Sequence, residues 1–440
     1  MPDPARSVRV QCPPGQDGPW ERHLWRVLLA HLGAAPAFGS EPAPDGVVRL
    51  SAQDGATLTL RTPAAPEPAG QWRRVRIETP VRAYDLLAGA GGCTLSGTPG
   101  AWTLDGDLAG PLIGLLRLQE DRDVPYRDRY GLVCGRDSPR CGPGLLSEPV
   151  LENAAAAIGD LLGLEVPARF GGRARWALAV SCDVDSVETD HIGDVLAVLA
   201  RHKVERPTFM VCAASDADKT VRDPRYDLAD AEIRRRLAPL ERADVEIGLH
   251  GSYLAHDRVA MLRAQKDRLE QVFGRAVPGH RSHYYRFAYP RSWAWQHRAG
   301  FAYDASLGYP DLPGLRMGCT GPVQFLDPQR GPVGFALCPT AILDQHFFWP
   351  RPWADEEVDA YLDSLTTKTA SAGGVLVVDW HTYTLGSAYP GWWRPLERLL
   401  SLARGRGAYV SGIAEALRYH GFGLTETASA DPESDPHESV

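Results

Sequence analysis

The chain has 440 residues, a length that suits two domains, or one large α/β domain with an appendage. Of these residues 44% are hydrophobic and 23% charged, a composition typical of a globular protein. A net charge of −8 without a long Lys/Arg run argues against a nucleic-acid-binding surface. No window approaches the ~20 apolar residues of a membrane span, and the N-terminus MPDPARSVRV lacks the apolar region of a secretory signal. We therefore expect a cytoplasmic protein without nucleic-acid or membrane partners.

Short strand patterns and Pro/Gly-rich connectors alternate over residues 1–150, behind an amphipathic helix over residues 20–32. This pattern predicts a small α/β domain with little obvious chemistry of its own. The helical stretch EPVLENAAAAIGDLLGL and the connector PARFGG predict a helix and linker over residues 151–174. The polar, acidic tail over residues 425–440 is predicted to be disordered.

From residue 175 to residue 424, apolar strand-like runs alternate with helical stretches. This order predicts a mostly parallel sheet, either a barrel or a doubly wound layer. Catalytic residues of such sheets gather at the carboxyl ends of the strands. The polar residues at the expected strand ends are Asp183, Asp185, His250, Arg281, His283, Asp304 and His381.

The stretch CDVDS places Asp183 and Asp185 two residues apart on an extended segment, so both carboxylates point to one face. Two like charges at that distance favour a nearby cation. His250 ends the third strand of the series, and an Asp/His set with open positions suits a divalent transition metal. The alternative interpretation is structural, with the aspartates capping a turn and the histidine hydrogen-bonded in the core.

The segment from Ala177 to about Leu417 resembles the polysaccharide deacetylase family, also called NodB-homology or carbohydrate esterase 4. Six short motifs follow the family's order, namely CDVD, RPTFMV, EIGLHGS, PGHRSHYYRF, YDASLGY with LRMGC, and VVDWH. The resemblance is closer to a divergent bacterial branch with an extra N-terminal α/β domain and the arginine motif GxRxHYxRF. It implies an α/β fold, an irregular (β/α)₇ barrel of the NodB type preceded by a small α/β domain.

The resemblance also implies a role for each matching residue. Asp183 would be the general base, with Arg281 orienting it, and His381 would be the general acid. Asp185 and His250 would be metal ligands. The implied cofactor is a divalent metal ion, with Zn²⁺ expected ahead of Co²⁺, Ni²⁺, Mn²⁺ or Fe²⁺.

One departure from the family concerns the third metal ligand. The family places a second histidine four residues after the first, and here that position is Leu254. His256 stands six residues after His250, which on a regular helix is a rotation of about 240°, so it needs a looped segment to reach the metal. Asp257 is expected to cap the next helix, leaving His256 outside it. His283 is the rival ligand, and completion by water or substrate, or a site without metal, also stays open.

Two further residues are candidate substrate contacts. Tyr284 belongs to a group of aromatic residues that suits sugar stacking. Arg316 either binds an anionic group or pairs with Asp311. The residues Asp344 and His346 follow another strand and are expected near the cleft.

The sequence therefore predicts a metal-dependent hydrolase that removes an acyl group, acetyl first among the candidates, from an amide nitrogen on a sugar or sugar-like small molecule. One alternative keeps the fold and predicts an amidohydrolase of a specialised biosynthetic pathway acting on a non-sugar amide. Another predicts a catalytically silent carbohydrate- or ligand-binding protein. The expected partner is a small-molecule or carbohydrate substrate, and the oligomeric state is open.

Overall fold

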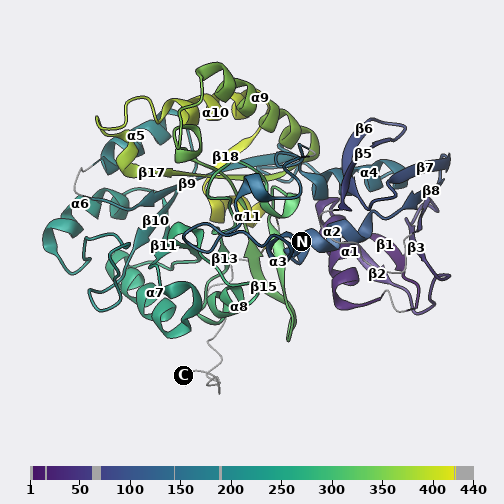
Figure 1. Cartoon of the computed structure of the whole chain (residues 1–440), viewed down its shortest axis with the longest axis horizontal. Coiled ribbons are helices and arrows are strands. Elements are labelled where there is room, and N and C mark those ends of the chain that lie inside the picture. The colour runs from purple at the N-terminus through teal and green to yellow at the C-terminus, as the bar shows by residue number, and fades with distance from the viewer. Residues whose placement is uncertain are drawn as a thin grey trace.

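The computed structural model describes residues 3–14, 17–61, 71–142, 144–187, 191–420 and 422. Two main sheets organise these residues, a six-stranded sheet near the N-terminus and a ten-stranded sheet that follows it in the sequence. Figure 1 shows the smaller sheet on one side of the molecule and the larger sheet, surrounded by helices, on the other.

The smaller sheet has the strand order β2-β1-β3-β4-β8-β7. Its strands are β1 (Asp3–Gln11), β2 (Ala34–Phe38), β3 (Val47–Ser51), β4 (Thr57–Arg61), β7 (Cys93–Thr98) and β8 (Ala101–Gly106), and a separate ribbon pairs β5 (Arg73–Glu78) with β6 (Ala83–Ala88). Val48, Leu50, Leu58 and Leu60 alternate with exposed or half-buried neighbours. That period of two buries one face of the sheet.

The larger sheet has the order β14-β15-β13-β12-β11-β10-β9-β17-β16, with β18 paired to β9 beside this path. Its strands are β9 (Trp176–Val184), β10 (Thr208–Cys212), β11 (Glu246–Gly251), β12 (Gly279–Ser282), β13 (Tyr303–Asp304), β14 (Val323–Asp327), β15 (Gly331–Leu337), β16 (Thr340–Leu343), β17 (Gly374–His381) and β18 (Tyr409–Ser411). All the pairings except β14 with β15 are parallel. The carboxyl ends of the parallel strands therefore share one edge.

The central strand β9 is buried along its whole length. It pairs in parallel with β10 and with β17, so its apolar residues pack on both faces, which explains a run of hydrophobic residues without alternation. The first polar residues that follow this run are the aspartates of CDVD. The buried strand thus delivers two carboxylates to the edge of the sheet.

Helices cover both sheets. They are α1 (Pro19–His31), α2 (Ala109–Leu116), α3 (Gln119–Asp123), α4 (Val150–Leu162), α5 (Ile192–Arg201), α6 (Ala231–Arg242), α7 (Val259–Phe273), α8 (Arg291–Arg298), α9 (Asp355–Ala372), α10 (Arg394–Gly405) and α11 (Ile413–His420). Helices α5 to α10 lie around the larger sheet, and α1 and α2 lie with the smaller one (Figure 1). Asp230 caps α6 by accepting a hydrogen bond from the Glu232 amide, and Gly274 ends α7 at φ 63°.

The predicted α/β class is confirmed, with a mixed α/β fold built on a curled, mostly parallel sheet. Among the described strands, no ladder joins β16 to β14 or β15, so hydrogen bonds do not close this sheet into a barrel. The finer (β/α)₇ description stays a prediction. Helix α4 packs on α1, β4 and β6, and one hydrophobic cluster continues from the smaller sheet into the larger, so the boundary at residue 150 also stays a prediction.

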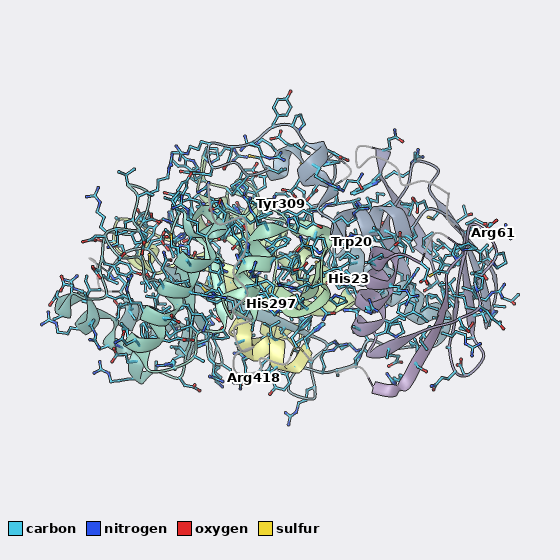
Figure 2. The ribbon with its side chains drawn as sticks, turned by 90° about the horizontal axis from the view of Figure 1, so that it is seen from below. Trp20, His23, Arg61, His297, Tyr309 and Arg418 are labelled. Carbon is cyan, nitrogen blue, oxygen red and sulfur yellow. The ribbon has the colours of Figure 1, made fainter. Side chains whose placement is uncertain are left out.

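Residues 119–149 pack against the larger sheet's part of the chain. Buried Glu120 and Arg140 lie close together, 3.5 Å between Oε2 and Nε, and each bonds the hydroxyl of Tyr309 at 2.8 Å. Gly135 donates its amide to Asp311 at 2.6 Å. In Figure 2, Tyr309 lies among the larger sheet's elements, away from Arg61 on the smaller sheet. This stretch was predicted within a domain of little chemistry, yet it borders the larger sheet.

One sequence expectation needs correction, and a second lies outside the described residues. Helix α7 begins at Val259 with Arg258 at its N-cap, so Asp257 does not cap it and lies in the short 3₁₀ helix η3 (Ala255–Asp257). The predicted disordered tail over 425–440 lies outside the described residues. Among the described helices, none combines the length and the apolar character needed to cross a bilayer.

His346 is a buried histidine whose protonation state is fixed by its two partners. Its Nδ1 accepts a hydrogen bond from the Leu343 amide at 3.1 Å, and its Nε2–H donates to the Tyr309 carbonyl at 3.0 Å. Burial lowers its pKa from 6.5 to about 4. A proton on Nδ1 would break the bond to Leu343, so the fold requires the neutral ring.

We predict that His346 makes folding sensitive to acid. Its folded pKa lies below its unfolded value, so its contribution is complete above pH 6.5 and is lost as the pH falls from 6.5 toward 4. The contribution is about 1–3 kcal/mol. Urea denaturation should show His346→Gln less stable than wild type at pH 7, with the difference shrinking at pH 5. A difference that stays constant between these pH values would contradict this prediction.

Candidate active site

The strands β9, β11, β12 and β17, with β10 between β9 and β11, bring the predicted site residues to one edge of the larger sheet. In the strand registers, Asp183 on β9 lies opposite His381 on β17, and His250 on β11 lies opposite Arg281 on β12. Asp185 follows β9 directly. These pairings make neighbours in space of residues that are up to 198 positions apart in the chain (381 − 183).

Arg281 is fully buried and binds Asp183 directly. Its Nη1 donates to Asp183 Oδ1 at 2.7 Å, while Nη2 donates to Ser181 Oγ at 2.8 Å and Nε to the Ala305 carbonyl at 3.1 Å. Burial alone would raise the pKa of Asp183, but Arg281 and His250 oppose it, and the net pKa lies below the ordinary value. Asp183 is therefore an ionised carboxylate with one oxygen held by Arg281.

A second carboxylate, Asp379, lies on the other side of Arg281. Its Oδ1 is 2.9 Å from Arg281 Nη1, and its Oδ2 accepts a hydrogen bond from the Tyr285 hydroxyl at 3.1 Å. Burial raises the pKa of Asp379 well above the ordinary value although Arg281 opposes that shift. Asp183 thus keeps the negative charge of this pair, and Asp379 holds the guanidinium from behind.

Asp185, His250 and His283 form a compact group of donor atoms, all within 4.8 Å of one another. His250 Nε2 is 3.2 Å from Asp185 Oδ1, and His283 Nε2 is 3.7 Å from Asp185 Oδ2. Ligands of a tetrahedral Zn²⁺ with bonds of about 2.1 Å stand about 3.4 Å apart. The spacing of the donors therefore fits a small divalent metal.

The other ring nitrogens of the two histidines have partners that fix the tautomers. His250 Nδ1 is 3.1 Å from the Arg281 carbonyl, which only accepts, so Nδ1 carries the proton and Nε2 has a free lone pair. His283 Nδ1 faces Asp223 Oδ1 at 3.4 Å. A carbonyl or carboxylate behind a histidine is the usual support of a metal-binding imidazole.

The charges of the site also call for a cation. Four carboxylates surround it, namely Asp183, Asp185, Asp223 and Asp344, against the Arg281 guanidinium and the charged ring of His381. Asp185 Oδ1 and His250 Nε2 are both buried without a hydrogen-bond partner in the described part of the chain. Asp185 and Asp223 raise the pKa of His283 to about 9 against the effect of burial, which shows the local negative field. These residues therefore fit a divalent metal, which would displace that proton.

His381 lies beside both aspartates of CDVD, since it is paired with Asp183 in the register of β17 with β9 and its ring faces Asp185. Its Nε2 is 3.4 Å from Asp185 Oδ2, and its Nδ1 donates to Asp344 Oδ1 at 3.0 Å. Asp344 is fully buried and also accepts hydrogen bonds from the His381 amide at 2.9 Å and from Thr384 Oγ1 at 3.1 Å. Burial would lower the pKa of His381, but Asp344 raises it well above 6.5. The ring is therefore a charged proton donor at neutral pH.

An open cleft of about 380 Å³ borders Asp185. Its lining residues are Asp185, Ser186, His191, Tyr383, Gly386, Ser387, Ala388 and Tyr389. The Tyr383 ring packs against His381, with centroids 5.2 Å apart. A small molecule in this cleft would reach both Asp185 and the acid His381.

Of the two histidines proposed as third ligand, the structure groups His283 with Asp185 and His250. His256 lies in η3 and does not belong to that group of donors. Burial and the neighbouring Arg286 lower the pKa of His256 to about 4. The geometry therefore favours His283.

The two predicted substrate contacts have different positions. Tyr284 is half-buried and its ring lies 4.3 Å from the ring of His283, so it borders the site. Arg316 is fully buried, donates to the Gly308 carbonyl at 2.7 Å and pairs with Asp121. Its expected role as a substrate contact, or as a partner of Asp311, therefore needs correction, since Arg316 joins residues 119–149 to the larger sheet and Asp311 pairs with Arg136.

Sequence reasoning did not assign two carboxylates of the site. Asp223 lies in a long connection between β10 and α6, and nothing in its surroundings signals contact with His283. Asp379 stands two residues before His381, in the quoted motif VVDWH, and that spacing on a strand was a usable signal because both side chains point to one face.

No family model and no curated protein matches this chain. Solved structures similar to it include polysaccharide deacetylases and family 4 carbohydrate esterases, together with a 4-α-glucanotransferase. A proposed polysaccharide deacetylase from Mycobacterium smegmatis has 17% identity and a TM-score of 0.41, covering 59% of this chain and 96% of its own. A family 4 pseudoenzyme from Bacillus anthracis has 13% identity and a TM-score of 0.32, covering 55% of this chain and 65% of its own. A family 4 carbohydrate esterase from Streptomyces lividans, in complex with acetate, has 10% identity and a TM-score of 0.31, covering 56% of this chain and 95% of its own.

We predict that the purified protein binds close to one divalent transition metal ion per chain through Asp185, His250 and His283. Elemental analysis after dialysis should show metal lost in Asp185→Ala, His250→Ala and His283→Ala, because each removes one donor of the group. His256→Ala is the matched control and should keep its metal. Loss of metal from His256→Ala but not from His283→Ala would identify His256, and not His283, as the third ligand.

We predict that Arg281→Met lowers the free energy of unfolding by about 3–5 kcal/mol, since it leaves a buried carboxylate without its cation. Adding Asp183→Asn should recover part of that loss by removing the stranded charge. Urea denaturation monitored by circular dichroism measures both variants. An Arg281→Met protein as stable as wild type would show that the buried pair is not needed for folding.

Proposed function

We propose that this protein is a metal-dependent amide hydrolase that removes an acyl group, acetyl in the first instance, from a sugar or sugar-like small molecule. The observation that carries the proposal is that Asp183 and His381 lie beside the Asp185–His250–His283 group, since Asp183 Oδ2 is 3.7 Å from His250 Nε2 and His381 Nε2 is 3.4 Å from Asp185 Oδ2. A base and an acid next to a candidate metal centre are the parts that hydrolysis of an amide requires.

The metal bound by Asp185, His250 and His283, for which Zn²⁺ is our first choice, would polarise the amide carbonyl and acidify a water molecule. Asp183 would accept a proton from the attacking water. Its Oδ1 is occupied by Arg281, while Oδ2 faces His250 Nε2 at 3.7 Å, so Oδ2 is the basic atom. The lowered pKa of Asp183 keeps it ionised before each turnover.

His381 supplies the second proton, to the nitrogen of the departing amine. Its Nε2 faces the Asp185–His250–His283 group, which we call the metal group, while Asp344 binds Nδ1. The proton on Nε2 is therefore the one directed at the substrate. Asp344 stabilises the charged ring before the transfer. One proton goes to Asp183 and one leaves His381, and exchange with solvent restores both groups after the products leave.

The remaining support concerns what the site would accept. The cleft of about 380 Å³ beside Asp185 suits a small molecule or the end of a glycan. Tyr383 and Tyr389 line the cleft and offer ring faces there. Aromatic rings of this kind pack on the apolar faces of sugars.

We predict that Asp183→Asn and His381→Ala each lower kcat for acetate release from N-acetylated sugars by at least about 100-fold. Both variants should keep their metal, because neither residue belongs to the donor group. Acetate release is measured with a coupled assay, and elemental analysis of the same samples gives the metal content.

Two outcomes separate this proposal from its alternatives. Release of acyl groups from non-sugar amides but not from N-acetylated sugars would keep the hydrolase chemistry and reject the sugar substrate. A fully metallated wild-type protein that releases no acyl group from any amide, while still binding sugars, would reject catalysis and indicate a binding protein.

A further inference from the structure

A cluster of arginine and tyrosine side chains lies beside the metal group, and none of the proposed catalytic steps uses it. We call it the Arg–Tyr cluster; its members are Arg129, Tyr130, Arg222, Tyr253, Tyr284 and Arg286. It contacts His283 through Tyr284, whereas the cleft of about 380 Å³ borders Asp185 itself. The cluster and the cleft therefore both adjoin the Asp185–His250–His283 group.

Ring contacts connect the cluster to the proposed metal ligand. Tyr284 lies 4.3 Å from His283 between ring centroids, and Tyr130 stacks on Tyr284 at 4.2 Å with 24° between the planes. Tyr253 meets Tyr284 edge-on at 5.9 Å, and its amide donates to Asp223, the carboxylate behind His283. The cluster thus begins one ring away from the candidate metal centre.

The cluster is basic, and its guanidinium groups stack on rings. Arg222 lies 4.6 Å from the Tyr253 ring and 6.0 Å from the Tyr130 ring, and Arg129 lies 4.9 Å from the Tyr130 ring. Both arginines are exposed. Within the described ranges, no carboxylate forms an ion pair with Arg129, Arg222 or Arg286. A guanidinium that stacks by its face keeps its N–H edge for an oxyanion.

Hydrogen bonds to Asp128 hold the backbone of the cluster at residues 128–132. Asp128 Oδ1 accepts the amides of Tyr130 at 2.8 Å and Leu132 at 2.9 Å, and Leu132 is buried against Tyr285. Tyr284 itself has φ 58°, a strained conformation for a non-glycine residue, which the structure retains beside its candidate metal ligand. The turn from residues 128–132 is therefore a fixed wall of the site.

We propose that the Arg–Tyr cluster binds an oxyanion, a phosphate or carboxylate, carried by the substrate whose amide reaches the metal group. The N-terminal part of the chain would then supply a specificity residue, Arg129, to the site. This inference rests on the proposed function for the identity of the reacting group, but the binding of the anion itself does not depend on turnover. The substrate class becomes an acylated amino sugar bearing a negative charge.

Direct binding to the metal-loaded Asp183→Asn protein tests the proposal without turnover. Isothermal titration should compare N-acetylglucosamine 6-phosphate and N-acetylglucosaminuronic acid, as the two oxyanion sources, with neutral N-acetylglucosamine. We expect at least one anionic sugar to bind roughly tenfold or more tightly than the neutral one. The sugar that does so shows whether the cluster takes a phosphate or a carboxylate. Arg129→Ala and Arg222→Ala, each in that background, should weaken it about tenfold and leave the neutral sugar within about twofold.

Arg61→Ala is the matched control, because Arg61 is an exposed arginine on the smaller sheet, at the far end of the molecule in Figure 2. It should bind like the parent, and Arg222→Lys should keep part of the affinity through its charge. Anionic binding that ignores both arginines would place the anion on the metal alone and overturn the proposal. Binding that needs the arginines in a protein that hydrolyses no amide would support the cluster and reject the proposed function.

Discussion

One buried guanidinium holds the site and the sheet together. Arg281 on β12 bonds Asp183 and Ser181 on β9, faces Asp379 on β17 and donates to the Ala305 carbonyl after β13. A planar fork with five donors satisfies these partners at once, which the single ammonium of a lysine does not. The same contacts that stabilise the strand ends also leave Asp183 ionised with its second oxygen turned to the metal group.

The remaining carboxylates follow from the charge that this arrangement leaves uncompensated. Asp223 and Asp344 are each buried behind a histidine, and Asp185 lies between the three imidazoles of His250, His283 and His381. Burial of so many acids is costly unless cations balance them. Charged histidines supply part of the positive charge that balances these acids, and a bound divalent ion would supply the rest. The electrostatics and the proposed chemistry therefore both favour a cation at the Asp185–His250–His283 group.

Residues 119–149 give the N-terminal part of the chain a share in the site. The Glu120–Arg140–Tyr309 contacts and the pairing of Arg316 with Asp121 fix this stretch to the larger sheet through buried charges. From that anchor the turn at Asp128 presents Tyr130 to Tyr284. A segment without obvious chemistry in the sequence thus comes within one ring of His283, since tertiary packing positions it.

The sequence by itself determined the mixed α/β class, most strands of the larger sheet and the positions of Asp183, Asp185, His250, Arg281 and His381 at strand ends. These follow from local signals, because an apolar run fixes a buried strand and the first polar residues after it fall at its edge. Only the tertiary structure decided between His283 and His256, brought Asp223 behind His283, buried Arg316 and placed Arg129 beside the site. Those outcomes depend on loops and on contacts between distant segments, whose geometry no local pattern encodes.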